Sequence, residues 1–393
     1  MTKNRIAIVI LLMIVTVSAF AQKEQLNPVY TGVTSLSIAP DARAGALGDV
    51  GVATEPDVNS QYWNPAKYPF NIARAGVSMS YTPWLRQLVS DIDLVNLVGF
   101  YRIGDYSALS GSLTYFSLGE VIAETHTIKP YEMALDIAYS RMLSETFSAA
   151  IAMRYIHGDM QYDITEDMSA GNAFAADIAL YYNKYLFAGN RECLLGLGLN
   201  ISNIGTKISY DGGATNQFIP TNMRLGASFM LPLDEYNTLS FSLDLNKLLV
   251  PTRPSYSQFL EEKGYEQGDN SYYSEYQSWL DEEGHNEVSS ISGIFKSFAD
   301  APGGAVEELK EIYGGVGVEY CYNQQFSLRA GYHYENEYKG NRKYFTVGAG
   351  FRMSVFSLDA AYLISTAQSN PLDQTLRFSL SFDMDGLKEL FRR

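Results

Sequence analysis

From residue 72 onward, apolar and polar positions alternate with a period of two, in stretches of about ten residues separated by turns. Alternation is the pattern of a strand with two unlike faces, and about ten residues is the length of a tilted strand that crosses a bilayer. A soluble β-sandwich, the alternative, usually has shorter strands. The pattern predicts about fourteen strands, at residues 72–81, 91–102, 106–116, 131–141, 146–156, 173–182, 192–201, 221–230, 238–248, 313–322, 326–334, 343–352, 355–364 and 375–383.

Each predicted strand has one large apolar face and one face of small and polar residues. In residues 239–246 the leucines and Phe241 share one face, whereas the serines, Asp244 and Asn246 share the other. A membrane barrel turns its apolar face to lipid and keeps the small, polar face for the lumen. The predicted fold class is therefore all-β, a transmembrane antiparallel barrel of about fourteen strands.

Charged residues fall on the predicted inner faces, and we interpret them as a structural network; an ion or solute path is the alternative role. Counting outward from the turns places Arg224 opposite Asp244 and Asp359 opposite Arg377. Such pairs stabilise a hairpin by about 0.2–1 kcal/mol, whereas a charge facing lipid would cost about 2–4 kcal/mol. The predicted network comprises Asp136, Arg154, Asp177, Arg224, Asp244, Arg329, Asp359 and Arg377.

The connections between strands alternate in length. Short ones lie at 103–105, 142–145, 323–325 and around Met353, and longer ones at 117–130, 157–172, 202–220 and 250–312. In outer-membrane barrels the short turns face the periplasm and the long loops face outward. We therefore expect the cell outer membrane as the location, with both termini on the periplasmic side of an even-stranded barrel.

The longest connection, 250–312, is predicted to be a partly helical extracellular loop. From Pro251 to Lys310 it holds twelve acids and four bases, a formal charge of -8, and it is rich in aromatic residues. Aromatic side chains dominate many protein-binding surfaces, so protein recognition is one interpretation, and a solvated lid over the barrel mouth is the other. Under the first interpretation the candidate contacts are Tyr256, Tyr272, Tyr273, Trp279, Glu282 and Glu283.

The first long loop contributes Trp84 and Leu85 as further candidate partner contacts. An aromatic anchor at the membrane surface is the alternative role for Trp84. Under either interpretation, outer-membrane lipids are the expected surroundings of the apolar strand faces.

The first 21 residues have the pattern of a secretory signal peptide. Lys3 and Arg5 precede an apolar run that ends before Ala19-Phe20-Ala21, a typical cleavage site, although an N-terminal membrane anchor is the alternative. Removal of this segment takes the formal charge from -15 to -17, which argues against nucleic acid as a partner. No later run of about eighteen apolar residues occurs, so no membrane helix is expected.

Residues 22–71 lack the alternation, and we predict that they form a plug inside the barrel. Glycines lie among alanines, and the sequence Trp-Asn-Pro-Ala at 63–66 ends the segment with a proline turn. Asp41 is a suitable N-cap for a short helix. An ordinary N-terminal cap of small helices is the alternative. The predicted division is thus a signal at 1–21, a plug at 22–71, a barrel at 72–384 and a periplasmic tail at 385–393.

No pattern in the sequence supports catalysis. The four histidines (126, 157, 285 and 333) are scattered, without the spacing of metal ligands, and the serine-hydrolase motif GxSxG does not occur. We predict no enzyme activity, no cofactor and no metal. A lipid hydrolase that uses His333 is a distant alternative.

The sequence of residues 40–70, together with YTPWLR at 81–86, resembles the PorV family of the type IX secretion system in Bacteroidota. The core of the first segment is shared more loosely with the FadL-like barrel superfamily. The resemblance implies a fourteen-stranded barrel with an N-terminal plug. It also implies a shuttle that receives the C-terminal signal domains of secreted cargo at the type IX translocon and delivers them to the attachment complex with a PorU-type sortase.

Two classes of function therefore compete. The first is a non-enzymatic secretion shuttle, and the second is a FadL-like transporter of hydrophobic solutes. A transporter of the second class needs an apolar lumen and a lateral opening, and the small, charged inner faces disfavour it.

Overall fold

The computed structural model describes residues 27–86, 89, 91–122, 127–160, 170–213, 215–282, 284, 287–366 and 372–384. The predicted signal (1–21), the predicted tail (385–393) and Glu283 lie outside the described residues. Within these ranges, none of the helices is both long and apolar enough to span a bilayer.

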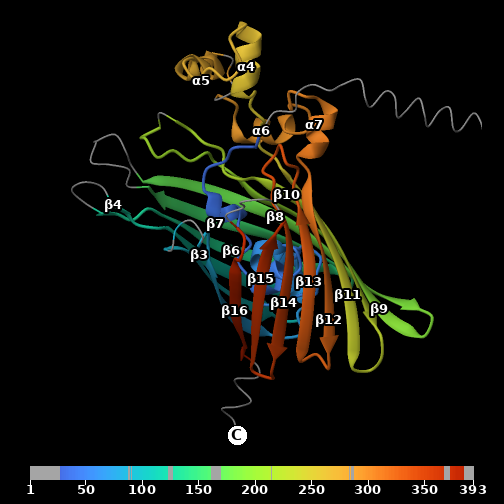
Figure 1. The fold of residues 1–393 in the computed structure, drawn as a ribbon. Helices are drawn as coiled ribbons and strands as arrows, with labels where there is room; N and C mark the ends of the chain where they lie inside the picture. Colours follow the sequence, from blue (N-terminus) through green and yellow to red (C-terminus); the bar gives the residue numbers. More distant parts are fainter. Residues whose placement is uncertain are drawn as a thin grey trace, which may run out of the picture.

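Fourteen antiparallel strands close into a single barrel, as predicted (Figure 1). β1 and β16 close it, with Tyr81 opposite Phe378. Strands that follow one another pair, except that β3 pairs with β6, because β4 and β5 form a small separate hairpin. The strands are β1 (Ala75–Pro83), β2 (Ile92–Ile103), β3 (Ser107–Leu118), β4 (Val121–Ile122), β5 (Thr127–Ile128), β6 (Tyr131–Ser144), β7 (Phe147–Asp159), β8 (Gly171–Ala188), β9 (Arg191–Gly205), β10 (Asn222–Pro232), β11 (Asn237–Leu248), β12 (Tyr313–Tyr322), β13 (Phe326–Tyr334), β14 (Lys343–Arg352), β15 (Phe356–Ser365) and β16 (Leu376–Asp383).

The two faces of each strand have the predicted characters. On β11, Phe241 and Leu243 are exposed on the outer surface, whereas Ser242 and Asp244 are buried on the inner one. Small inner residues leave room in the lumen, and the N-terminal segment occupies that room.

Four short helices of the N-terminal segment lie inside the barrel, where Figure 1 shows them in blue. They are η1 (Thr34–Ser37), α2 (Ala42–Gly45), α3 (Ser60–Trp63) and η2 (Pro65–Phe70). Asp41 caps α2 as predicted, because its side chain accepts a hydrogen bond from the Ala44 amide. α2 packs against β14, β15 and β16, and η2 packs against β3, β6, β7 and β8. We call residues 34–70 the plug.

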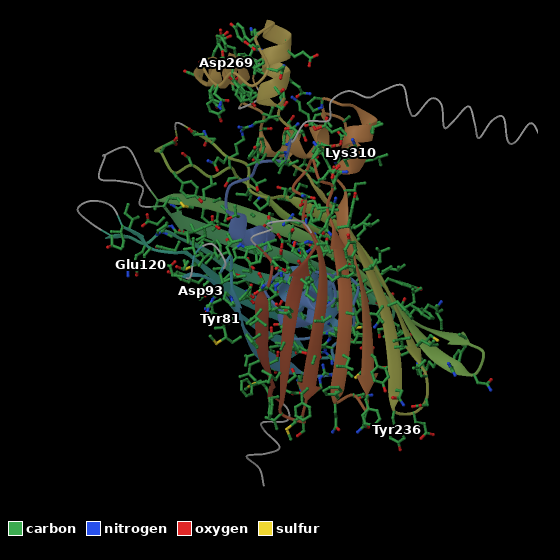
Figure 2. All side chains as sticks on the ribbon, viewed as in Figure 1. Tyr81, Asp93, Glu120, Tyr236, Asp269 and Lys310 are labelled. Carbon is green, nitrogen blue, oxygen red and sulfur yellow. The ribbon has the colours of Figure 1, made fainter. Side chains whose placement is uncertain are left out.

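Four further helices form a lobe at one end of the barrel: α4 (Tyr256–Lys263), α5 (Tyr273–Glu282), α6 (Ser290–Lys296) and α7 (Ala305–Lys310). We call this end the lobe rim, and the end that carries the short turns the turn rim. Figure 2 shows Asp269 and Lys310 at the lobe rim and Tyr236 at the turn rim. These helices lie within residues 250–312, the loop that the sequence predicted to be partly helical. Ser255 and Gln258 form a capping box at the start of α4, and Gly264 ends that helix in the left-handed conformation.

The described chain begins and ends at opposite rims. The Asn27 amide donates to the Tyr338 carbonyl at the lobe rim, whereas Asp383 pairs with Gly76 at the turn rim. The two termini themselves lie outside the described residues, so the expectation that both lie on the periplasmic side stays a prediction. An even strand count places the start of the first strand and the end of the last strand at the same rim. It does not fix the course of the segment that precedes the first strand. The segment before β1 runs the other way through the lumen, so Asn27 emerges at the lobe rim.

Candidate functional site

Three buried charge clusters lie on the inner face of the barrel. In the first, Arg154 of β7 pairs with Asp136 of β6 and Asp177 of β8, with 3.2 and 3.1 Å between its Nη2 and one oxygen of each. Asp177 lies at a bulge in β8, and its other oxygen accepts a hydrogen bond from the Asn203 amide. All three charged side chains are thus enclosed and paired, which is the condition under which buried charges are tolerated.

The second cluster joins the plug to the wall. Glu319 of β12 accepts hydrogen bonds from Arg43 of the plug and from Arg329 of β13. Arg43 also contacts Asp57 at 3.0 Å, and Arg329 contacts Asp359 at 2.7 Å. Positive and negative side chains therefore alternate along this cluster, which runs from the plug to strands β12, β13 and β15 of the wall.

The third cluster is centred on Asp49 of the plug, which is bound by Arg377 of β16 and by the hydroxyl group of Tyr344. Two more network residues contact the plug without an ion pair. Asp244 accepts hydrogen bonds from the Gly51 and Val52 amides at 2.7 and 2.9 Å. The guanidinium of Arg224 lies 4.5 Å from the centre of the Tyr62 ring, a cation–π contact.

Both predicted cross-strand pairs are wrong, because each arginine or aspartate lies opposite a residue two positions away from its predicted partner. Arg224 lies opposite Asn246, and Asp244 lies opposite Gly226. The Asp234 carboxylate accepts hydrogen bonds from the Tyr236 and Asn237 amides, and this turn moves the centre of the hairpin one residue further along the chain.

The second predicted pair is wrong by the same amount, since Arg377 lies opposite Ala361 and Asp359 lies opposite Ser379. A turn in which the Thr375 amide donates to Leu372 takes up residues before β16 and shifts the register. A shift of two residues keeps each side chain on the same face. Every member of the predicted network is accordingly buried, and those members bind the plug or each other rather than their predicted partners.

Sequence reasoning missed the charged residues that complete these clusters: Arg43, Asp49 and Asp57 of the plug, and Glu319 of the wall. Glu319 alternates with Val318 and Tyr320, so strand parity alone would have placed it on the inner face. The plug partners have no such signal, because nothing local in the sequence sets their register against the wall.

The aromatic residues of the lobe divide into a core and a surface. Phe259, Tyr276, Trp279 and Leu280 are buried against one another between α4 and α5. Trp279 retains 7% exposure and is therefore a core residue, which corrects the expectation that its ring is offered to a partner. Tyr256 and Tyr272 are partly buried against this core, whereas Tyr273 is 56% exposed. Glu282 is exposed at the end of α5.

The other two predicted contacts, Trp84 and Leu85, are partly buried. Both pack against Ile38 and its neighbours on one side and against the cluster of Tyr344 and Leu363 on the other. They therefore join the first loop to the upper part of the plug and wall, and offer only part of their surface to a partner.

Ion pairs fix the lobe to the barrel at α7. Lys247, near the end of β11, contacts Glu308 and Glu311 at 2.9 and 2.6 Å. Lys339, in the loop after β13, contacts Glu311 at 3.0 Å and also Glu307. Nearby, burial raises the pKa of Asp300 to about 6. Because two lysines bind three glutamates, the end of the lobe is held at the rim.

Among the described residues, no group of three or more histidine, cysteine or carboxylate side chains is placed to hold a metal ion. His333 is buried, where its Nδ1 lies 3.2 Å from the Gly48 carbonyl and its ring stacks on Tyr344. Its contacts are those of a side chain packed between plug and wall.

Residues 20–255 match the family model described as "Type IX secretion system protein PorV". The chain belongs to this family. That membership makes it an outer-membrane component of type IX secretion, and the closed fourteen-stranded barrel agrees with an outer-membrane location. No curated protein matches the chain.

Several solved structures resemble the chain at low identity. The toluene transporter TbuX of Ralstonia pickettii has a TM-score of 0.46 and 10% identity, over 89% of this chain and 99% of that one. A FadL homologue of Pseudomonas aeruginosa has a TM-score of 0.45 and 12% identity, over 91% and 99%. The toluene transporter TodX of Pseudomonas putida has a TM-score of 0.47 and 10% identity, over 91% and 99%.

Proposed function

We propose that this chain is a non-enzymatic carrier that binds the C-terminal domains of secreted proteins at its lobe rim. It would take them from the type IX translocon and deliver them to the attachment complex with its PorU-type sortase. Membership of the PorV family supports a place in this secretion system. The carrier role itself goes beyond that membership and rests on the filled lumen.

The observation that carries the proposal is the ion-paired plug. Arg43 and Asp49 bind the wall through Glu319 and Arg377, so the plug is fastened to strands on more than one side. A conduit would need these buried pairs to open, and breaking such a pair costs about 3–5 kcal/mol. A lumen of this kind favours transport on the surface of the molecule. It also disfavours the alternative, a hydrophobic-solute transporter, because paired charges line the path.

The loop lengths support an orientation in the membrane. Long connections and the helical lobe lie at one rim and tight turns at the other, which in outer-membrane barrels face outside and periplasm respectively. The C-terminal strand end would then face the periplasm, and Asn27 would face outward. The exposed apolar face of the strands would contact outer-membrane lipids.

Within the lobe, we assign the cargo contact to the exposed side chains of Tyr273 and Glu282, supported by the partly buried Tyr256 and Tyr272. Trp84 and Leu85 border the same rim and form the second part of the proposed surface. Aromatic side chains backed by a packed core are typical of binding hot spots.

Deletion of the gene tests the function. We expect secreted cargo to lose its surface attachment, while uptake of fatty acids is unchanged. Re-expression of the full chain should restore attachment. Normal attachment in the deletion strain would end the carrier proposal, and loss of fatty-acid uptake instead would favour the transporter.

A further inference from the structure

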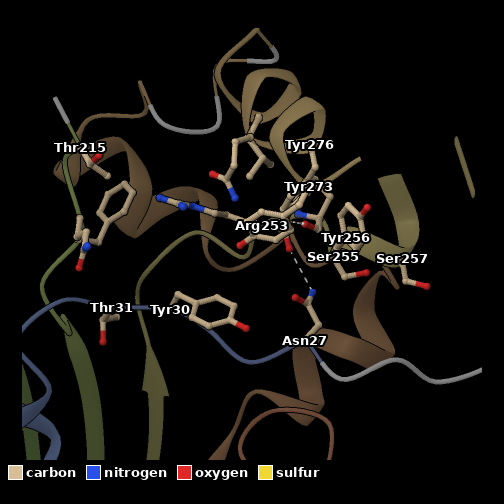
Figure 3. A pocket seen from close by; sticks show the side chains of 15 residues that line it. Asn27, Tyr30, Thr31, Thr215, Arg253, Ser255, Tyr256, Ser257, Tyr273 and Tyr276 are labelled. Atoms are coloured by element: carbon tan, nitrogen blue, oxygen red, sulfur yellow. Dashed lines mark hydrogen bonds between the residues drawn. The ribbon is translucent and has the colours of Figure 1, made fainter. Parts of the chain in front are cut away.

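A cavity of about 630 Å³ lies between the lobe and the N-terminal residues that emerge at the lobe rim (Figure 3). Its walls come from three separate segments: Asn27–Thr31, the loop at 215–218, and the lobe from Arg253 to Leu280. This volume lies within the usual range of ligand sites, about 300–1,000 Å³.

Hydrogen bonds hold these three walls together. The Asn27 side chain donates to the Arg253 carbonyl at 3.2 Å, and the Gly32 amide donates to the Phe218 carbonyl at 2.8 Å. The hydroxyl group of Tyr276 donates to the Pro254 carbonyl at 2.7 Å. The cavity is therefore preformed, which lowers the entropic cost of binding.

The charge of the cavity is opposite to that of the lobe around it. From Pro251 to Lys310 the formal charge is -8, yet Arg253 is the single charged residue among those that line the cavity. No ion pair of Arg253 occurs within the described residues. A second cation lies close by, because the ammonium group of Lys207 is 4.3 Å from the centre of the Phe218 ring, a lining residue.

Aromatic rings surround this positive group. Figure 3 shows the Arg253 side chain reaching across the cavity above the ring of Tyr30, with Tyr256 and Tyr273 on the lobe side. Tyr30 is 71% exposed and Tyr273 is 56% exposed, so both rings are available to a ligand. Tyrosine and arginine, together with tryptophan, are enriched at energetic hot spots.

We propose that this cavity binds an acidic residue of an extended peptide segment in a partner protein. The carboxylate lies on the Arg253 guanidinium, and an apolar or aromatic neighbour of the acidic residue lies between Tyr30 and Tyr273. The inference deepens the proposed function and rests on it, since the peptide would belong to the cargo or to its receiving complex.

A peptide fits the electrostatics better than a phosphate-rich headgroup does. One lining arginine matches one carboxylate, whereas a cluster of phosphates calls for several bases. The acidic surface of the lobe repels a polyanion but attracts basic residues on either side of a single acid. A positive cavity within a negative lobe therefore favours an acidic anchor with basic flanks.

The test uses purified full-length protein in lipid nanodiscs and two fluorescein-labelled pentapeptides, Lys-Phe-Asp-Phe-Lys and Lys-Phe-Asn-Phe-Lys. Fluorescence polarisation measures their dissociation constants. We expect the aspartate peptide to bind about tenfold more tightly, because a hydrogen-bonded charge pair replaces a neutral contact. Arg253→Gln should remove this preference, and Arg253→Lys should retain part of it. Arg191→Gln, at an exposed arginine of the turn rim, is the matched control and should leave the preference intact.

Equal binding of the two peptides by the wild-type chain, or binding of neither, overturns the proposal. So does a preference that persists in Arg253→Gln. Displacement of the aspartate peptide by inorganic phosphate or by lipopolysaccharide vesicles would assign the cavity to a phosphate group instead. These outcomes are separate from the deletion phenotype, so the carrier function stands if only the peptide preference is absent.

Discussion

Arg43 of the plug and Glu319 of the barrel wall form a buried ion pair, with 3.1 Å between Nη2 and Oε1. The two residues lie far apart in the sequence, and Glu319 also binds Arg329. One carboxylate thus serves two guanidinium groups, and removal of its charge would leave both of them buried without their shared partner.

We therefore expect Glu319→Gln to lower the free energy of unfolding by about 3–5 kcal/mol, the usual cost of breaking a buried ion pair. The measurement is the Tm of the detergent-solubilised barrel, followed by the heat-induced shift of its band in gel electrophoresis. Glu235→Gln removes the same charge at an exposed position of the turn rim and should leave the Tm unchanged. Equal Tm values for the two variants would contradict the assignment of Glu319 to the plug–wall contact.

A second prediction concerns the close approach of the plug to β13. A Cβ atom on Gly331 would lie 2.2 Å from the Gly48 nitrogen, and backbone cannot move aside as a flexible side chain can. Gly331→Ala should therefore displace the plug, destabilise the protein by about 1–3 kcal/mol or more, and raise the conductance of the barrel in planar bilayers. Gly99→Ala is the control, because its Cβ would meet only ordinary contacts, the nearest at 3.5 Å. A plug that stays sealed and stable in Gly331→Ala would contradict a tight backbone contact between the plug and β13.

The crossing of the lumen by the N-terminal segment predicts which residues are labelled on intact cells. Tyr30→Cys, at the lobe rim, should react with a membrane-impermeant maleimide, whereas Tyr236→Cys, at the turn rim, should react only after permeabilisation. Both tyrosines are more than half exposed, so access to the reagent decides the result. The two native cysteines, Cys193 and Cys321, are replaced by serine beforehand. Labelling in the reverse order would invert the proposed orientation.

The barrel could be predicted from the sequence because its information is local. Alternation with period two sets the face of each residue, and the alternating loop lengths set the rims. Strand register is less local. The Asp234 turn places the centre of its hairpin one residue further along the chain than predicted, so Arg224 does not lie opposite Asp244, although both residues lie on the inner face as predicted.

The contacts between plug and wall could not be predicted in the same way. Glu319 was identifiable as an inner-face residue, but its partner Arg43 lies in a segment without periodicity, and only the folded chain brings the two together. Burial within the lobe also depends on packing that is not local in the sequence. Trp279 and Tyr273 both lie in one short aromatic helix, and packing against Phe259 rather than composition decides which ring is enclosed.

The stability of the lobe should depend on pH through Asp300. Burial raises the pKa of this carboxyl group to about 6, while the Thr252 backbone amide offsets part of the rise. An unfolded aspartate ionises at lower pH, so the stability contributed by protonated Asp300 is lost as pH rises toward 6 and stays lost above it. At about pH 7.5, Asp300→Asn should therefore have a higher Tm than the wild type, and the two should converge only near pH 4, where an unfolded aspartate also becomes protonated. A constant difference between their Tm values at both pH values would exclude this group as the cause.

The last prediction separates a contact residue of the lobe from a core residue. Tyr273→Ala should reduce co-purification of secreted cargo severalfold without changing the Tm, because its exposed ring can contribute about 1 kcal/mol or more to binding and little to the fold. Trp279→Ala should instead destabilise the lobe by about 3–5 kcal/mol, as large-to-small substitutions in a core do. Cargo would then be lost through unfolding of the lobe, so Trp279→Ala alone cannot identify the surface. Tyr273→Phe keeps the ring and is the matched control. If Tyr273→Ala retains cargo at the wild-type level while Trp279→Ala unfolds the lobe, the lobe is a structural cover and the cargo surface lies elsewhere on the rim.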